Sequence, residues 1–160
     1  MGKVIAIVNQ KGGVGKTTTA VNIAAGIAKL GKKVLLLDLD PQGNATSGLG
    51  ISKKNLQFTS TEVLLGECRP QEAVIKTKYK GLELIPSTSS LAAGEIALMS
   101  MEHRNHQLKK AIVQIKDQYD LIFIDCLPSL GPLAINALVA SNHIIVPMQC
   151  EHYSLEGLAQ

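Results

Sequence analysis

The chain has 160 residues, of which 46% are apolar and 18% charged, a composition typical of one soluble globular domain with a sizeable core. No stretch approaches the roughly 20 uninterrupted apolar residues of a membrane helix, so we expect a cytoplasmic protein without membrane contact. The formal net charge of +3 is too small to indicate nucleic-acid binding, because no block of lysine and arginine and no aromatic platform accompanies it.

Cysteine and histidine do not indicate a metal site. Cys68, Cys126 and Cys150 contain no C-x-x-C pair, and their odd number disfavours a disulfide framework as well as structural zinc. His103 and His106 could share a helix face, but no further ligands stand nearby. A solvated helix end is therefore the better interpretation of that pair.

Strands and helices alternate along the chain. Apolar residues at helical spacing between positions 20 and 27, followed by Gly31 as a C-terminal stop, predict a first helix. The same spacing between positions 108 and 115 predicts a second. Runs of leucine and β-branched residues, nearly continuous in apolar character as in strands buried on both faces, predict five strands: 4–9, 34–40, 82–87, 121–126 and 143–148.

This alternation predicts a doubly wound α/β fold, with a mainly parallel sheet, helices on both faces and one domain over residues 1–160. The polar segment 41–57 is expected to be a mobile loop at the carboxyl edge of the sheet, where ligands of such folds bind. The helical pattern of 151–160 stops without a cap or a return strand. We therefore expect a domain truncated at its C-terminus, with strand 143–148 as an exposed edge.

The segment "NQKGGVGKTTTA" at positions 9–20 joins the first strand to the first helix. Lys16 would reach the β- and γ-phosphates of a nucleotide, and the hydroxyl of Thr17 would bind Mg²⁺. The positive end of the following helix favours the same anion. Backbone N–H groups can converge on a phosphate because three positions of the loop are glycines: Gly12, Gly13 and Gly15.

Other interpretations of this loop fit less well. The pattern GxxxxGK[ST] requires glycine at position 10, where Gln10 stands, so a variant with lysine beside the glycines fits better. A plain glycine turn would not need the K-T-T that follows. A dinucleotide-binding fingerprint, with Asp38 on the ribose, requires a third glycine where Thr18 stands.

Three aspartates are expected beside this loop. Alternation along "DLD" places Asp38 and Asp40 on one side at the end of the second strand, near the phosphate edge. The alternative interpretation is a pair of acids that simply faces solvent at the strand end. Asp125 follows four apolar residues, in the position of an acid that holds Mg²⁺ through water.

These motifs together resemble the ParA/MinD family of P-loop ATPases, and the match extends through most of the chain. "KGGVGKTT" resembles the family's deviant Walker A motif and "LLLDLDPQGNAT" its switch I. "LIFIDCLPSLGPLAINAL" resembles the Walker B strand with switch II, and "HIIVPMQCEHYSLEGLAQ" the elements that come next. The set is most similar to the ParA/Soj partitioning branch.

The resemblance implies a role for each site residue. Lys11 would cross a dimer interface to the partner's ATP, and Asp40 would orient the attacking water with support from Asp38. Lys11, Lys16 and Asp40 would thus be catalytic. Mg²⁺ would be held by Thr17, Asp40 and Asp125. ATP would contact the whole loop: Lys11, Gly12, Gly13, Val14, Gly15, Lys16, Thr17 and Thr18.

The chain departs from the family after Asp125. Many relatives have Pro-Pro two residues past the aspartate, whereas this chain has Leu127 and then Pro128. The missing proline removes a conformational restraint, so switch II is expected to be looser. Relatives that hold an iron–sulfur cluster carry cysteine where Pro128 stands, which argues against a cluster here.

The resemblance implies a Mg²⁺-dependent ATPase that acts as an ATP-driven dimerisation switch in chromosome or plasmid partitioning. The expected partners are a second copy of the chain and a ParB-like stimulating protein. Nonspecific DNA is a further candidate, although the usual DNA-binding part lies beyond residue 160. The alternative is a fragment that binds nucleotide or self-associates without turnover. The MinD branch is disfavoured, because these residues contain no amphipathic membrane helix.

Overall fold

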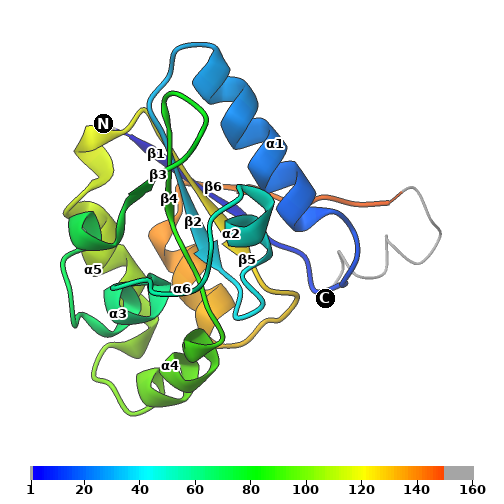
Figure 1. Cartoon of the computed structure of the whole chain (residues 1–160). Coiled ribbons are helices and arrows are strands. Elements are labelled where there is room, and N and C mark those ends of the chain that lie inside the picture. The colour runs from blue at the N-terminus through cyan, green and yellow to red at the C-terminus, as the bar shows by residue number, and fades with distance from the viewer. Residues whose placement is uncertain (1, 150–160) are drawn as a thin grey trace.

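The computed structural model describes residues 2–149, and its centre is a six-stranded sheet (Figure 1). The strand order is β3-β4-β2-β5-β1-β6, and every pair is parallel except β3 with β4. The predicted fold class is therefore confirmed. The strands are β1 (Lys3–Ile7), β2 (Val34–Leu39), β3 (Ile75–Lys76), β4 (Leu82–Ile85), β5 (Leu121–Cys126) and β6 (His143–Ile145).

Helices cover both faces of the sheet, as the alternating pattern predicts (Figure 1). One face carries α1 (Lys16–Lys29) and α2 (Asn44–Gly48). The other carries α3 (Ser60–Leu65), α4 (Ser90–Leu98), α5 (Gln107–Val113) and α6 (Pro132–Ala140). Three short 3-10 helices complete the described part: Pro70–Ala73, Arg104–His106 and Lys116–Gln118.

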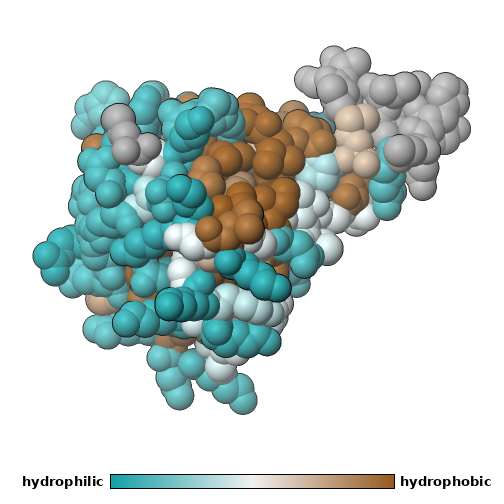
Figure 2. All heavy atoms as spheres, turned by 90° about the horizontal axis from the view of Figure 1, so that it is seen from above, coloured by the Kyte–Doolittle hydropathy of each residue, from teal (hydrophilic) through white to brown (hydrophobic). Residues whose placement is uncertain are grey.

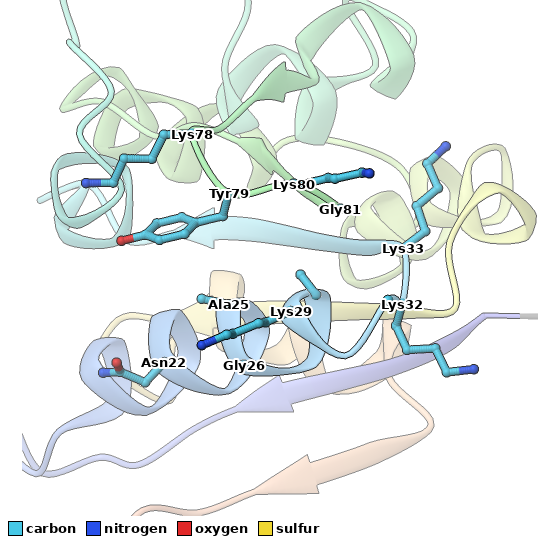
Figure 3. A pocket seen from close by; sticks show the side chains of 12 residues that line it. Asn22, Ala25, Gly26, Lys29, Lys32, Lys33, Lys78, Tyr79, Lys80 and Gly81 are labelled. Carbon is cyan, nitrogen blue, oxygen red and sulfur yellow. The ribbon is translucent and has the colours of Figure 1, made fainter.

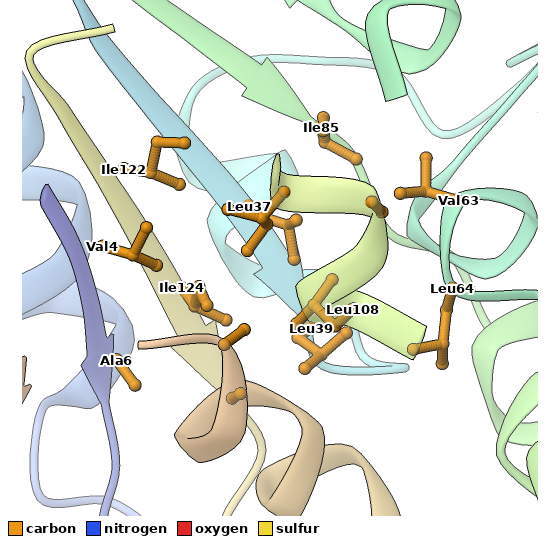
Figure 4. Close-up of a cluster of buried hydrophobic side chains, with 14 of the residues drawn as sticks. Val4, Ala6, Leu37, Leu39, Val63, Leu64, Ile85, Leu108, Ile122 and Ile124 are labelled. Atoms are coloured by element: carbon orange, nitrogen blue, oxygen red, sulfur yellow. The ribbon is translucent and has the colours of Figure 1, made fainter. Parts of the chain in front are cut away.

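Strand β2 lies in the middle of the sheet, and all six of its residues are buried. Leu37 and Leu39 pack with Ile124 of β5 against α3 and α5, as Figure 4 shows. Leu36, on the opposite side of the strand, packs with Phe123 against α1. A strand that is covered on both faces needs apolar residues at consecutive positions, which explains the uninterrupted "VLLL" of the sequence.

The parallel register brings the carboxyl ends of three strands to one edge. Asp125 of β5 is the register partner of Asp38 in β2 and of Ile7 in β1. The glycine loop, residues 11–18, leaves β1 at this edge and therefore lies beside both acids. The register thus assembles one site from segments that are far apart in the sequence.

Several expectations about single elements need correction. Residues 44–48 form α2, so the prediction of a loop over 41–57 is wrong there. Thr46 is fully buried, and its N–H donates to the Asp38 carboxylate at 2.8 Å, a tertiary contact that local sequence does not reveal. Strand β6 ends at Ile145, before the predicted limit. Cys150 and the helical pattern of 151–160 lie outside the described residues.

Strand β6 is the outer strand on its side of the described sheet, in line with the expected edge. The side chain of Ile144 is 54% exposed there. None of the helices within residues 2–149 is long and apolar enough to cross a membrane.

Candidate functional site

A hollow of about 590 Å³ opens at the carboxyl edge of the sheet, where three segments meet. The first is the glycine loop with the start of α1, the second follows β2, and the third follows β5. Its lining is Gly12, Gly13, Gly15, Lys16, Thr17, Thr18, Asp40, Pro41, Gln42, Asn44, Cys126, Leu127 and Pro128.

The backbone of the glycine loop is shaped for a ligand. Gly13 and Gly15 have φ angles of 72° and 85°, a left-handed conformation that side chains disfavour. A β-carbon at either position would meet no atom of the described residues within 4 Å, so these residues leave the space beside the backbone open. Gly15 caps α1 without a side-chain hydrogen bond, which leaves the first N–H groups of this helix for an anion.

Lys16 is the buried lysine of the glycine loop. Only 6% of the residue is exposed, and its Nζ donates to the carbonyl oxygen of Lys11 at 2.8 Å. Burial lowers the pKa of Lys16, while attraction to Asp125 and then to Asp40 acts in the opposite direction. The side chain therefore places a positive charge under the loop, close to two carboxylates.

Asp125 is fully buried, and neither of its carboxylate oxygens has a hydrogen-bond partner among residues 2–149. Burial raises its pKa to about 7; repulsion from Asp38 and Asp40 adds to this effect, and the nearby Thr17 hydroxyl and Lys16 ammonium oppose it. The Thr17 hydroxyl lowers the pKa of Asp125, although it forms no hydrogen bond with the carboxylate in this structure. An unpartnered buried carboxylate is costly, so a cation bound here would stabilise it.

The donors around Asp125 fit Mg²⁺. Oxygen is the ligand atom that this ion prefers, and Thr17, Asp40 and Asp125 all offer it. Within residues 2–149 no group of three or more His, Cys, Asp and Glu side chains is arranged to hold a metal by itself. Mg²⁺ usually keeps several waters and takes its remaining ligands from few carboxylates and from phosphate oxygens.

Asp38 and Asp40 differ in their surroundings. Asp38 is fully buried and accepts three hydrogen bonds: from the N–H and hydroxyl of Thr46 at 2.8 and 2.7 Å, and from the N–H of Asp40 at 3.2 Å. Burial raises the pKa of Asp38, and the bonds from Thr46 and Asp40 partly offset this rise. Asp40 lines the hollow, and its Oδ1 accepts from the N–H of Gln42 at 2.8 Å.

Two predicted contact residues of the loop do not line the hollow. Val14 is buried, and Lys11 lies exposed at the rim. The N–H of Lys11 donates to Oδ1 of Asn9 at 2.9 Å, which fixes the backbone at the start of the loop. The other predicted loop residues, together with Asp40, line the hollow. Asp125 is not in the lining, but it directly precedes Cys126, which is.

Sequence reasoning missed the residues that support the acids from behind. The Thr46 hydroxyl bonds Asp38 and also accepts from the N–H of Ser87 at 3.0 Å, and all three residues are fully buried. Gln42 is held through its carbonyl oxygen by the Lys53 ammonium. The sign of their role is that Thr46 and Ser87 are polar and fully buried. Burial can be seen only in the folded chain, so the sequence does not reveal it.

The strand, glycine loop and helix, with acids ending two neighbouring strands at the same edge, define a protein of the P-loop class. The chain belongs to the AAA_31 family of AAA domains, whose model matches residues 2–160. The resemblance to ParA/Soj partitioning ATPases that the motifs predict is confirmed by relatives that match over the whole chain.

Among these relatives, the sporulation initiation inhibitor protein Soj of Bacillus subtilis is 52% identical over 160 residues, which are 100% of this chain and 63% of Soj. The chromosome partitioning protein ParA of Myxococcus xanthus is 47% identical over 100% of the chain and 56% of ParA. The chain thus spans about three fifths of the length of these curated relatives.

Solved structures share the fold. A Mycobacterium smegmatis structure named cobyrinic acid a,c-diamide synthase, with bound ATP analogue and magnesium, has a TM-score of 0.95 and 42% identity. The comparison covers 100% of this chain and 65% of that one. A Cyanothece McdA–ATP complex has a TM-score of 0.92 and 27% identity, and covers 98% and 60% of the two chains.

Proposed function

We propose that the chain binds Mg²⁺-ATP in the hollow at the carboxyl edge and hydrolyses it as part of a chromosome or plasmid partitioning ATPase. One observation carries the proposal: the buried, unpartnered Asp125 carboxylate lies beside a glycine loop with its own buried lysine. A cation with an attached polyphosphate would satisfy both charges at once. The ligands in the related solved structures and the names of the curated relatives support the same assignment.

The loop and the start of α1 would hold the phosphates. Backbone N–H groups of residues 12–18 and the positive end of α1 bind the phosphate oxygens, and Lys16 adds a charge-assisted hydrogen bond. The Thr17 hydroxyl would hold Mg²⁺ directly, and Asp125 and Asp40 would each hold it through water. The bound ion neutralises charge on the β- and γ-phosphates.

Asp40 would orient the water that attacks the γ-phosphorus. In this step the new P–O bond forms as the bond to the bridging oxygen of ADP breaks, and inorganic phosphate and ADP leave. Asp38 acts through Asp40, because its carboxylate accepts the Asp40 N–H. It is a positioning residue, held in turn by Thr46.

The dimerisation switch rests on Lys11. This residue is exposed at the rim, outside the lining of the hollow in its own chain. Two chains that face each other across their loops would bring each Lys11 to the partner's ATP, where a cation stabilises charge on the transferred phosphoryl group. A ParB-like stimulating protein and nonspecific DNA belong to the same proposal, because the resemblance of the motifs to partitioning ATPases implies them.

Lys11→Ala is expected to abolish ATP-dependent dimers while nucleotide affinity stays within about threefold, because the remaining loop still holds the phosphates. Size-exclusion chromatography with light scattering, with Mg²⁺ and a non-hydrolysable ATP analogue, measures the dimer, and calorimetry measures affinity. Lys54→Ala, which removes an exposed lysine elsewhere, is the matched control. Dimers of Lys11→Ala at the control's level contradict the role in trans.

Asp40→Ala is expected to lower ATP turnover by about 100-fold and to leave nucleotide bound, because the attacking water loses its orienting carboxylate. A phosphate-release assay beside nucleotide-binding calorimetry separates the two effects. Asp117→Ala removes an exposed carboxylate far along the chain and serves as the control. Turnover that remains within about twofold of the unmodified chain excludes the catalytic role of Asp40.

A second candidate is nucleotide binding without turnover. It is favoured by the exposed apolar edge at β6, where the Ile144 side chain is 54% exposed. Titration of Mg²⁺-ATP by calorimetry, followed by a turnover assay on the same sample, decides between them. Binding with turnover supports the ATPase, binding alone selects the second candidate, and the absence of binding excludes both.

A further inference from the structure

A second hollow, of about 850 Å³, lies at the opposite, amino edge of the sheet. One wall is the C-terminal half of α1 with the residues that lead into β2, and the other is the segment 78–81 that leads into β4 (Figure 3). We call it the lysine groove, because five lysines line it: Lys29, Lys32, Lys33, Lys78 and Lys80. Figure 2 looks onto this end of the molecule, where hydrophilic side chains lie beside an apolar area.

The groove concentrates positive charge without compensation from its own walls. Its lining contains no aspartate or glutamate, and none of the ion pairs described within residues 2–149 involves a groove lysine. Glu83 of β4 accepts the Tyr119 hydroxyl at 2.5 Å, and the Lys33 ammonium lies 5.0 Å from the centroid of the Tyr119 ring. Asp120 accepts the backbone N–H of Lys33 at 2.8 Å. Like charges gathered in one hollow repel each other, so a bound anion would relieve the repulsion.

The two walls are held in fixed positions. The Thr77 hydroxyl donates to the carbonyl oxygen of Leu82 at 2.8 Å and accepts the N–H of Tyr79 at 3.1 Å, which closes the turn that carries Lys78 and Lys80. Gly81 has a φ of 85°, and a β-carbon there would lie 2.9 Å from the carbonyl oxygen of Lys32. The walls therefore meet at this glycine, and the groove is pre-organised for a ligand.

Helix electrostatics explain only part of the lysine cluster. Lys29 lies in the last turn of α1, where a cation is favourable beside the helix carbonyl groups. Lys78 and Lys80 belong to a separate segment on the other wall, to which this explanation does not apply. The Lys78 ammonium lies 5.2 Å from the centroid of the Tyr79 ring, which itself is 41% exposed.

We infer that the lysine groove is a second anion site, separate from the glycine loop, for a small multiply phosphorylated ligand. Its volume falls within the range of small-molecule sites, and the lysines stand on both walls of a concave space. Elements that read duplex nucleic acid protrude into its grooves, whereas this feature is hollow. The Tyr79 ring adds an aromatic surface for a nucleoside-like part. Asn22 adds its Oδ1 as an acceptor, since its Nδ2 donates to the carbonyl oxygen of Thr18 at 2.8 Å.

The groove and the glycine loop can be occupied at the same time. They lie at opposite ends of α1, whose 14 residues span about 20 Å. The inference thus goes beyond the proposed ATPase and does not require it. A ligand in the groove would contact the end of α1 and the start of β2, and would leave the site of hydrolysis open.

The test uses inorganic tripolyphosphate as the probe and backbone amide NMR as the readout. With Mg²⁺-ADP present in excess, tripolyphosphate is expected to shift the resonances of residues 22–33 and 78–81 and to leave those of residues 11–18 unchanged. The separate readout of the two regions distinguishes failure of the groove from failure of the ATP site. Because binding is electrostatic, the affinity is expected to fall as salt rises.

Variants decide whether the groove itself binds. Lys78→Gln with Lys80→Gln is expected to weaken tripolyphosphate binding by about tenfold, because two ammonium groups of one wall are lost. Lys54→Gln with Lys109→Gln removes the same charge from exposed positions elsewhere and is expected to change affinity by less than about twofold. Equal weakening by both pairs, or no shifts at the groove, overturns the inference.

Oligonucleotides form the second arm of the test. Short single-stranded and duplex oligonucleotides are titrated by fluorescence anisotropy against the same two pairs of variants. If they bind in a way that depends on Lys78 and Lys80 while tripolyphosphate does not, the groove is a nucleic-acid surface and the small-ligand assignment is wrong. If tripolyphosphate alone shows this dependence, the inference is supported.

Discussion

The Lys16→Ala chain is expected to lose Mg²⁺-ATP affinity by at least about 100-fold, or roughly 3 kcal/mol. The ammonium of Lys16 is held under the glycine loop by the carbonyl oxygen of Lys11, and it is the buried cation of the site's lining. Its removal takes away a charge-assisted hydrogen bond to phosphate. It also leaves Asp125 and Asp40 without a compensating charge, so a polyanion meets net repulsion at the loop.

Isothermal calorimetry with Mg²⁺ and a non-hydrolysable analogue measures the loss. Lys54→Ala, which removes an exposed lysine, controls for the change in net charge and is expected to bind as the unmodified chain does. A circular-dichroism melt shows that Lys16→Ala remains folded. If the folded variant binds within about threefold of the control, the assignment of the phosphate site to the glycine loop is wrong.

The second large effect is expected from Asp125→Asn. This variant should raise the stability of the ligand-free chain and weaken the binding of Mg²⁺-ATP. In the absence of Mg²⁺ and above about pH 7, where Asp125 is ionised, the variant is expected to be more stable by about 1 to 4 kcal/mol, because a buried carboxylate is replaced by a neutral group of the same shape. The same change removes the anionic oxygen that would hold Mg²⁺. Stabilisation of the fold by Mg²⁺-ATP should therefore decline sharply.

The pH dependence gives this prediction a distinct signature. Burial raises the pKa of Asp125 from 3.8 to about 7, so the folded chain binds this proton more tightly than the unfolded chain does. The contribution of Asp125 to stability is therefore greatest below the lower pKa. It is lost as pH rises through the range between the two values and stays constant above about pH 7.

Urea denaturation without Mg²⁺, repeated between acidic and mildly alkaline pH, measures this contribution. Asp125→Asn should remove the contribution of Asp125 to the slope of unfolding free energy against pH. Asp117→Asn, at an exposed position, should leave that slope unchanged. Asp38 retains its own raised pKa in both variants, so the comparison isolates Asp125. Parallel pH profiles for Asp125→Asn and the unmodified chain contradict the burial argument.

Much of the fold follows from local patterns. The apolar run of β2 predicted a strand covered on both faces, and all of its residues are buried. The segment around Lys16 predicted a strand, a glycine loop and a helix in that order, and α1 begins at Lys16. Both signals are strong because they rest on contiguous residues. The local patterns do not predict helices α3, α4 and α6, and they predict a loop where α2 forms.

The candidate site was predicted as a set of residues, and only the structure gave their surroundings. Asp38 and Asp40 were expected as a pair, but Asp40 lines the hollow while Asp38 is buried behind it. The difference is due to Thr46, whose N–H and hydroxyl both bond Asp38. A threonine in a polar segment gives no local sign that it will be buried against a carboxylate.

The amino-acid sequence by itself determined the strand–loop–helix unit, the parallel α/β class and the acids that end two strands, because these depend on neighbouring residues and their periodicity. The tertiary structure alone decided that Asp125 lies without a hydrogen-bond partner and that lysines from three segments line one groove. The small net charge of +3 does not reveal such a groove. Charge density depends on which distant residues the register and the crossovers bring together, and composition holds no information about distance.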